Sequence, residues 1–116
     1  MPHVRFSECA VLQIKNFVHL YEEGFFMLYK DSGIWAEDAI IEHYQNIATT
    51  LNDRLFAEIE RRLSEEVVLG RKERGEWSEL VFHVGDRLIV VYFSESSEHN
   101  TRVIEYVGID RKPIIF

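Results

Sequence analysis

Hydrophobic and polar positions change their period just past the middle of the chain. Before about residue 65, apolar residues recur at spacings of three and four, the period of a helix with one buried side. Beyond that point, apolar and polar residues alternate, which is typical of strands in a sheet with one covered face. The sequence therefore predicts a single α+β domain over residues 1–116, with a helical half (about 7–65) followed by a sheet half (about 66–116).

Two helical segments are expected after a short opening strand at residues 3–6. Ser7 is the expected N-cap of the first helix, which should run from residue 8 to about residue 23. Gly24 is one candidate end, and the apolar run 25–29 would otherwise add a further turn or two. The second segment covers about residues 35–65. A capping-box pattern at residues 50–53 leaves open whether it is one helix or two.

The best-marked strands form a hairpin over residues 80–93, which turns at Gly85 and Asp86. A two-residue turn with Gly first suits type II′ geometry. The resulting register predicts an apolar face that covers the helices, with the pairs Val84–Arg87, Phe82–Ile89, Leu80–Val91 and Ser78–Phe93. The other face is mixed and holds the pairs Glu79–Tyr92, Val81–Val90 and His83–Leu88.

The remaining sheet half is predicted as an antiparallel meander. Residues 66–70 should start the sheet, and residues 71–76 and 94–100 should be loops. Residues 101–109 should form the closing strand. Pro113 argues against a central strand beyond that point, so the last residues are expected to be an edge or a tail.

Composition restricts the classes of function. The chain has 116 residues, 20 acids and 13 bases, and a net charge of −7, with 12 of the acids before residue 67. Tight, sequence-independent binding to duplex nucleic acid requires clustered positive charge, which is not the global pattern here. The single cysteine, Cys9, excludes an internal disulfide framework. No stretch resembles a signal peptide or a membrane span, so a cytoplasmic protein is expected.

Element order and two segments suggest a family. The order strand, helix, helix, meander resembles the RelE/ParE superfamily of small toxins from toxin–antitoxin modules. Residues 4–12 are similar to that family's opening strand and first helix, and residues 85–92 and 102–112 to its central hairpin and closing strand. Family closing strands often end in Gly and a basic pair, as Gly108, Arg111 and Lys112 do here. The resemblance implies action on translation or gyrase and neutralisation by a small antitoxin.

Two departures from the family pattern bear on activity. Ribosome-dependent members are typically strongly basic and carry a His or Tyr near the C-terminus, whereas this chain is acidic and ends in Pro-Ile-Ile-Phe. The sequence therefore predicts weak or no RNA cleavage. The alternative is a non-catalytic interaction module, immunity-like or regulatory, that binds a basic protein partner through an acidic helical face. Oligomeric state and contact with nucleic acid stay open.

Basic residues of the sheet half are the candidates for contact with nucleic acid or phosphate. Four acids lie among or beside Arg71, Lys72 and Arg74 in the sequence, so a solvated charged loop is the competing interpretation for these three residues. Arg87 and Arg102 could gather with Arg111 and Lys112 at the sheet if the register of the closing strand allows it, although an arginine beside a turn is more often solvent-exposed. The candidates are Arg71, Lys72, Arg74, Arg111 and Lys112.

Acid–base chemistry has its own candidates. Besides Arg111 and Lys112, these are His83 and Tyr92, which share a sheet face with Glu79. Residues 79 and 83 lie about 13 Å apart along a strand, so they do not form a dyad. A cross-strand hydrogen bond between Tyr92 and Glu79 is the simpler, structural interpretation. No histidine has a partner at metal-ligand spacing, so neither a metal nor a cofactor is expected.

Overall fold

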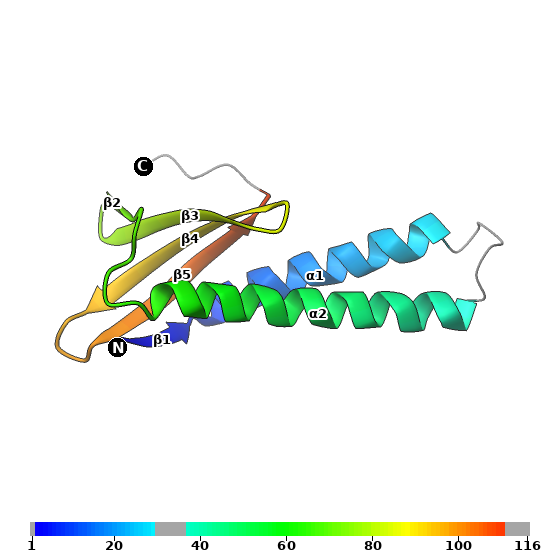
Figure 1. Cartoon of the computed structure of the whole chain (residues 1–116), viewed down its shortest axis with the longest axis horizontal. Helices are drawn as coiled ribbons and strands as arrows, with labels where there is room; N and C mark the ends of the chain where they lie inside the picture. Colours follow the sequence, from blue (N-terminus) through cyan, green and yellow to red (C-terminus); the bar gives the residue numbers. More distant parts are fainter. Residues whose placement is uncertain (1, 30–36, 111–116) are drawn as a thin grey trace.

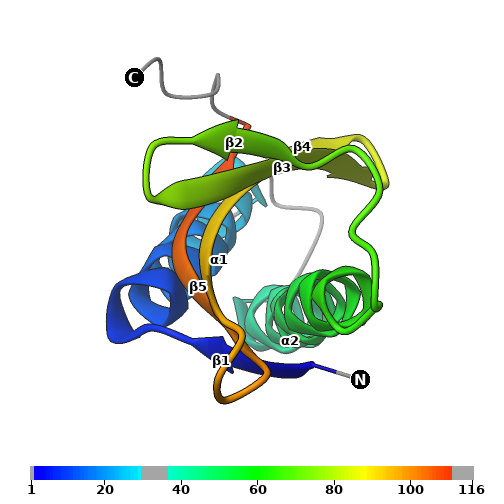
Figure 2. The same ribbon diagram turned by 90° about the vertical axis from the view of Figure 1, so that its left-hand side faces the viewer.

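The computed structural model describes residues 2–29 and 37–110, and the side chains of residues 2–20, 42 and 45–110. Its element order confirms the predicted α+β fold (Figure 1). The elements are β1 (His3–Phe6), α1 (Glu8–Tyr29), α2 (Glu37–Leu63), β2 (Lys72–Arg74), β3 (Trp77–Val84), β4 (Arg87–Ser96) and β5 (Thr101–Ile109). In the end view the sheet curves around α2, and α1 lies beside β5 (Figure 2).

The five strands are ordered β1-β5-β4-β3-β2. Strands β2 to β5 form the expected antiparallel meander. The opening strand β1 pairs with β5 in parallel, from His3 opposite Thr101 to Phe6 opposite Ile104, so the sheet is mixed. Strand β5 runs in the same direction as β1, which forms one edge of the sheet and contacts the start of α1.

The register of the β3–β4 hairpin agrees with the prediction at all seven pairs, from Ser78–Phe93 to Val84–Arg87. Gly85 has φ of 60° and Asp86 keeps a negative φ, as a type II′ turn requires. The inward face of the hairpin packs on the helices. The core consists of Ala10, Ile14, Val18, Ala48, Leu55, Ile59, Leu63, Val68, Leu80, Phe82, Val84, Ile89, Val91, Phe93, Ile104, Val107 and Ile109.

The start of α1 is tied to β5 by polar side chains. The Ser7 Oγ accepts a hydrogen bond from the Ala10 backbone N–H (3.0 Å), which confirms Ser7 as the N-cap. The same hydroxyl donates to the carbonyl of Glu105 (3.1 Å). One turn later, the Gln13 Oε1 accepts from the backbone N–H of Val107 (2.7 Å), beyond the last residue of β1. Side chains of α1 thus complete the hydrogen bonding of β5 where β1 ends.

The helices settle two questions that the sequence left open, and three expected boundaries in the sheet half were wrong. Helix α1 continues past Gly24 to Tyr29. Helix α2 is one helix through residues 50–53, where the Thr50 hydroxyl donates to the carbonyl of Asn46 (2.9 Å) instead of capping a new helix. Residues 66–70 are not a strand.

The sheet instead starts with β2, inside the expected loop 71–76. This strand turns into β3 at Gly75, whose φ of 67° suits a second tight hairpin. Strand β4 also extends to Ser96, three residues into the expected loop 94–100. The segment after Pro113 lies outside the described residues. Neither described helix is long and apolar enough to cross a membrane.

Candidate functional site

The first polar cluster joins the sheet to the end of α2. Its centre is Arg102, which is 4% exposed. The Arg102 guanidinium donates to the carbonyls of Leu63 (2.7 Å), Glu65 and Glu66 (3.0 Å), and its Nε donates to the Glu95 carboxylate (2.9 Å). These carbonyls follow the last turn of α2, where a helix leaves its acceptors unpaired and favours a cation. Arg102 therefore caps α2 from the neighbouring sheet.

Arg71 extends this cluster toward β3. Its guanidinium donates to the Ser78 hydroxyl (2.6 Å) and to the carboxylates of Glu95 and Glu73 (3.3 Å for Glu73). The hydrogen bond from Arg71 lowers the pKa of Glu95, and Arg102 lowers it further, although partial burial acts in the opposite direction. The same bond raises the pKa of Arg71. Both groups thus stay charged and neutralise one another at neutral pH.

A second polar cluster lies on the other face of the sheet. The Tyr92 hydroxyl donates to the Glu79 Oε2 (2.8 Å), which confirms the predicted cross-strand hydrogen bond. Tyr92 and Glu79 are 0% and 2% exposed, and the Arg74 Nε lies 3.5 Å from the Glu79 Oε2. The rings of Trp77 and Tyr106 flank Tyr92, with centroids 6.2 and 5.8 Å from its own.

This second cluster has the properties of a buried structural network. A general acid or base must reach the proton that it transfers, yet the Glu79 side chain is only 3% exposed. His83 lies exposed on the same face. No hydrogen bond or ion pair joins His83 to Glu79 in the part of the chain that the structure describes, in agreement with the absence of a dyad. Tyr92 and Glu79 stabilise the β3–β4 pair.

The candidate phosphate ligands are thus divided between two faces of the sheet. Arg71 joins the network on the helix side, and Arg74 lies beside Glu79 on the opposite side. Lys72, between them, is exposed. Arg111 and Lys112 lie outside the described residues. A single phosphate does not contact both Arg71 and Arg74 in this arrangement.

The register of the closing strand, which the sequence left open, does not bring Arg87 and Arg102 together. Arg87 lies at the start of β4, where it pairs with Asp110 (2.6 Å) just after β5 ends. Arg102 lies at the opposite end of β5. The antiparallel register of β4 and β5 separates them, because Ile89 pairs with Ile109 and Glu95 pairs with Arg102.

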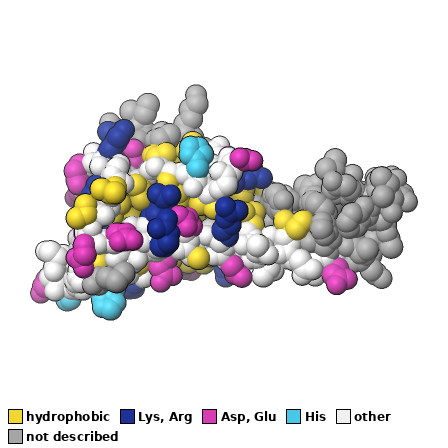
Figure 3. Space-filling model, viewed as in Figure 1, with side chains coloured by type: hydrophobic (Ala, Val, Ile, Leu, Met, Phe, Trp, Pro, Cys, Tyr) yellow, Lys and Arg dark blue, Asp and Glu magenta, His cyan; other side chains and the backbone are white. Residues whose placement is uncertain are grey.

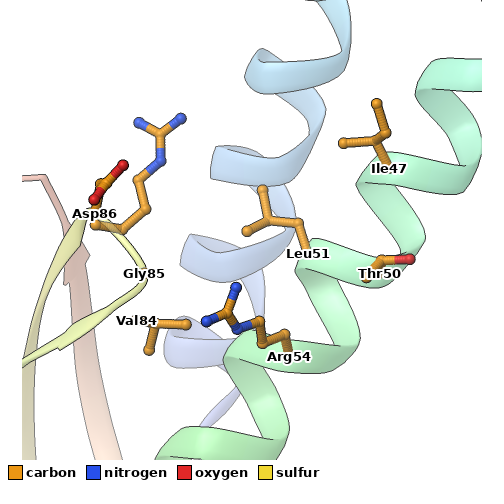
Figure 4. Close-up of a pocket in the computed structure, with 8 residues that line it drawn as sticks. Ile47, Thr50, Leu51, Arg54, Val84, Gly85 and Asp86 are labelled. Atoms are coloured by element: carbon orange, nitrogen blue, oxygen red, sulfur yellow. The ribbon is translucent and has the colours of Figure 1, made fainter.

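A ligand-sized groove lies between α2 and the β3–β4 turn. It has a volume of about 430 Å³ and is lined by Ile47, Thr50, Leu51, Arg54, Val84, Gly85, Asp86 and Arg87. The Arg54 side chain extends from α2 toward Val84 and the turn (Figure 4). A Cβ at Gly85 would lie 3.6 Å from the Arg54 Nη1, so the glycine leaves room for this guanidinium.

The sequence contained no motif for this groove. Arg54 belongs to a helix and Gly85 to a turn, and only the packing of the hairpin on α2 brings them together. The groove can bind a carboxylate or phosphate at Arg54 and apolar groups at Leu51 and Val84. No cluster of metal-ligating side chains occurs within the described residues. Comparison with protein-family profiles, curated proteins and solved structures returned no match to this chain.

Proposed function

We propose that this chain is a RelE/ParE-like toxin-family protein that acts on translation or gyrase by binding, with weak or no RNA cleavage, and that a protein partner neutralises it. The observation that carries the proposal is the arrangement of elements. An opening strand, two long helices and a four-stranded meander follow one another. This is the order on which the resemblance in the sequence rests.

The state of the candidate catalytic groups supports binding over cleavage. Tyr92 and Glu79 are buried in a hydrogen bond, and His83 has neither of them as a partner. General acid–base assistance is typically worth about 10²–10⁴-fold, so its loss leaves little cleavage. Arg54 and the turn at Gly85 offer a surface for a bound acidic or phosphorylated group instead.

The pairing of Arg71 with Glu95 and of Arg74 with Glu79 also favours a second candidate function. A non-catalytic interaction module, immunity-like or regulatory, needs no free phosphate ligands. In this function the protein binds a partner without arresting growth. Five of the eleven acids of the helical half that would form its acidic face lie at positions 22–38, whose side chains are outside the described set.

Growth after expression separates the two candidates. The chain is expressed without its genomic neighbours, beside the double variant Arg111→Ala/Lys112→Ala and the control Arg5→Ala, an exposed arginine of β1. The toxin function predicts growth arrest that the double change relieves and the control does not, because basic groups of the sheet half are expected to engage a phosphate-rich target. The absence of arrest at every expression level would favour the interaction module.

A further inference from the structure

The outer edge of β3 is only partly paired. Strand β2 covers residues 77–79, so residues 80–84 have no neighbour on that side among the residues that the structure describes. In a hairpin with a two-residue turn, the pair beside the turn exchanges both backbone hydrogen bonds, and bonded pairs alternate from there. The backbone groups of Val84 and Phe82 therefore point to β4. Those of Val81 and His83 point away from the sheet.

Exposed apolar side chains lie beside this free edge. Val81 is 40% exposed on β3, and Val67 and Leu69, in the segment before β2, are 69% and 84% exposed. The same segment and Leu80 line a cavity of about 230 Å³ against the end of α2. Proteins usually protect an edge strand with charges, a bulge or a covering segment. Apolar residues beside unpaired backbone groups indicate a surface that a partner covers.

Arginines of α2 bring positive charge to this edge of a chain that is acidic overall. Arg62 lies over the ring of Phe82, with its guanidinium carbon 4.4 Å from the ring centroid. Arg61 and Arg62 line the cavity beside Leu80, and Arg54 lies at the turn. In Figure 3, Lys and Arg side chains lie across the boundary between β3 and α2, next to hydrophobic ones.

Acids offset this positive charge. Glu58 binds both Arg61 and Arg62, and Glu65 also acts on Arg61. Asp86 lies at the turn and lines the same groove as Arg54. Three acids thus stand against the three arginines, so the edge is close to neutral on a chain of net charge −7. This edge therefore repels an acidic ligand less than the chain as a whole does.

We propose that residues 80–84 of β3 form a docking edge that takes an extended segment of a protein partner as an additional strand. The segment carries carboxylates that meet Arg54, Arg61 and Arg62, alternating with aliphatic side chains that cover Val81. Backbone groups of Val81 and His83 supply the hydrogen bonds, as in other cases of strand addition. The inference rests on the proposed function only in assuming that a protein partner exists.

A second copy of this chain fits the edge less well than an acidic segment does. Pairing two identical edges would bring their arginines together, and like charges across an interface oppose association. An acidic–aliphatic strand meets the same arginines with opposite charge. Self-association through β3 is therefore the competing outcome of the test.

Selection of displayed random peptides on the purified protein tests the docking edge. Val81→Pro removes the outward N–H of residue 81 and leaves the bonds to β4 intact, and proline is tolerated at a sheet edge. Val81→Thr is the matched control, because it keeps the N–H and the branched shape. Circular dichroism and thermal melting verify that both variants fold. Arg62→Glu tests the charge, with Arg5→Glu as its control on β1.

If residues 80–84 form the docking edge, the selection should enrich peptides in which acidic residues alternate with aliphatic ones. Their affinity should fall about tenfold in Val81→Pro and in Arg62→Glu, and stay within about twofold in Val81→Thr and Arg5→Glu. In the unchanged protein, bound peptide should slow hydrogen exchange at the amides of Val81 and His83. This measurement does not depend on the folding of any variant.

Several results would overturn the inference. These are no enriched peptide, peptides that are basic, equal binding to the proline and threonine variants, or protection of Val81 and His83 by self-association alone. Growth arrest without peptide binding would remove this inference and leave the proposed function standing. Peptide binding without arrest would do the reverse.

Discussion

Replacing Arg102 with methionine should destabilise the protein more than any change at an exposed arginine. Arg102 is 4% exposed and donates to four acceptors, which are the carbonyls of Leu63, Glu65 and Glu66 and the carboxylate of Glu95. Methionine fills most of the volume but leaves the carbonyls without this donor at the end of α2. Glu95 would keep Arg71 as its partner.

The expected loss follows from the cost of breaking buried charged contacts. Hydrogen bonds to a charged group contribute about 1.5–3 kcal/mol each and are not additive, and removing one member of a buried ion pair costs about 3–5 kcal/mol. We expect Arg102→Met to lower the free energy of unfolding by about 3–5 kcal/mol. Because a small domain is stable by about 5–15 kcal/mol, this loss would remove a large part of the total stability.

Urea unfolding followed by circular dichroism measures the effect. With a slope of about 1–3 kcal/mol per molar urea, the midpoint should move down by more than about 1 M. Arg61→Met is the matched control, since Arg61 is an exposed arginine of α2 paired only on the surface with Glu58. Its midpoint should stay close to that of the unchanged protein. Equal midpoints for the two variants would refute the capping role of Arg102.

Three further changes test other parts of the structure. Ile89→Asp should lower the free energy of unfolding by several kcal/mol or unfold the domain, because Ile89 is 0% exposed on the helix side of the sheet. Leu88→Asp should be tolerated, because Leu88 lies half-buried on the other face. Equal melting temperatures of the two variants would contradict the assigned faces. Tyr92→Phe should lower the free energy of unfolding, measured in urea, by about 1–3 kcal/mol, because buried Glu79 loses this hydrogen-bond donor. Tyr106→Phe changes a half-buried ring and should lower it less. Equal losses would argue against the Glu79 hydrogen bond as a stabilising contact. Arg71 lowers the pKa of Glu95 below its ordinary value of 4.5, so the contribution of Glu95 to stability is complete above pH 4.5 and is lost as the pH falls through the lowered pKa. Glu95→Gln should therefore lose less stability than the unchanged protein when the pH falls below 4.5. The same dependence of stability on acidic pH in both proteins would contradict the pairing.

Local patterns predicted most of the fold because each depends on neighbouring residues. The two-residue turn at Gly85 and Asp86 fixed the hairpin register, and alternation then assigned both faces. Ser7 was recognisable as an N-cap for the same reason. The errors and the open questions arose where tertiary contacts decide. The Thr50 hydroxyl bonds to the preceding turn of an unbroken helix, and the backbone of residues 65 and 66 bonds to Arg102 instead of forming a strand.

The sequence predicted less of the candidate site than of the fold. Arg71 and Arg74 looked like one basic cluster. Arg71, just before β2, pairs with Glu95, whereas Arg74, at the end of β2, lies beside Glu79 on the other face of the sheet. The groove at Arg54 and the free edge at Val81 depend on where β2 ends and how the hairpin meets α2. Neither feature has a sequence motif, because both are made by elements far apart in the chain.

Primer extension on cellular transcripts after induction of the chain alone tests the central claim most directly. The account predicts that growth stops while the transcripts keep their ends, because Tyr92 and Glu79 are buried in a hydrogen bond and the chain is proposed to act by binding. New transcript ends that appear with induction, and that persist in Tyr92→Phe and disappear in Arg111→Ala/Lys112→Ala, would contradict it and identify the protein as an efficient ribonuclease.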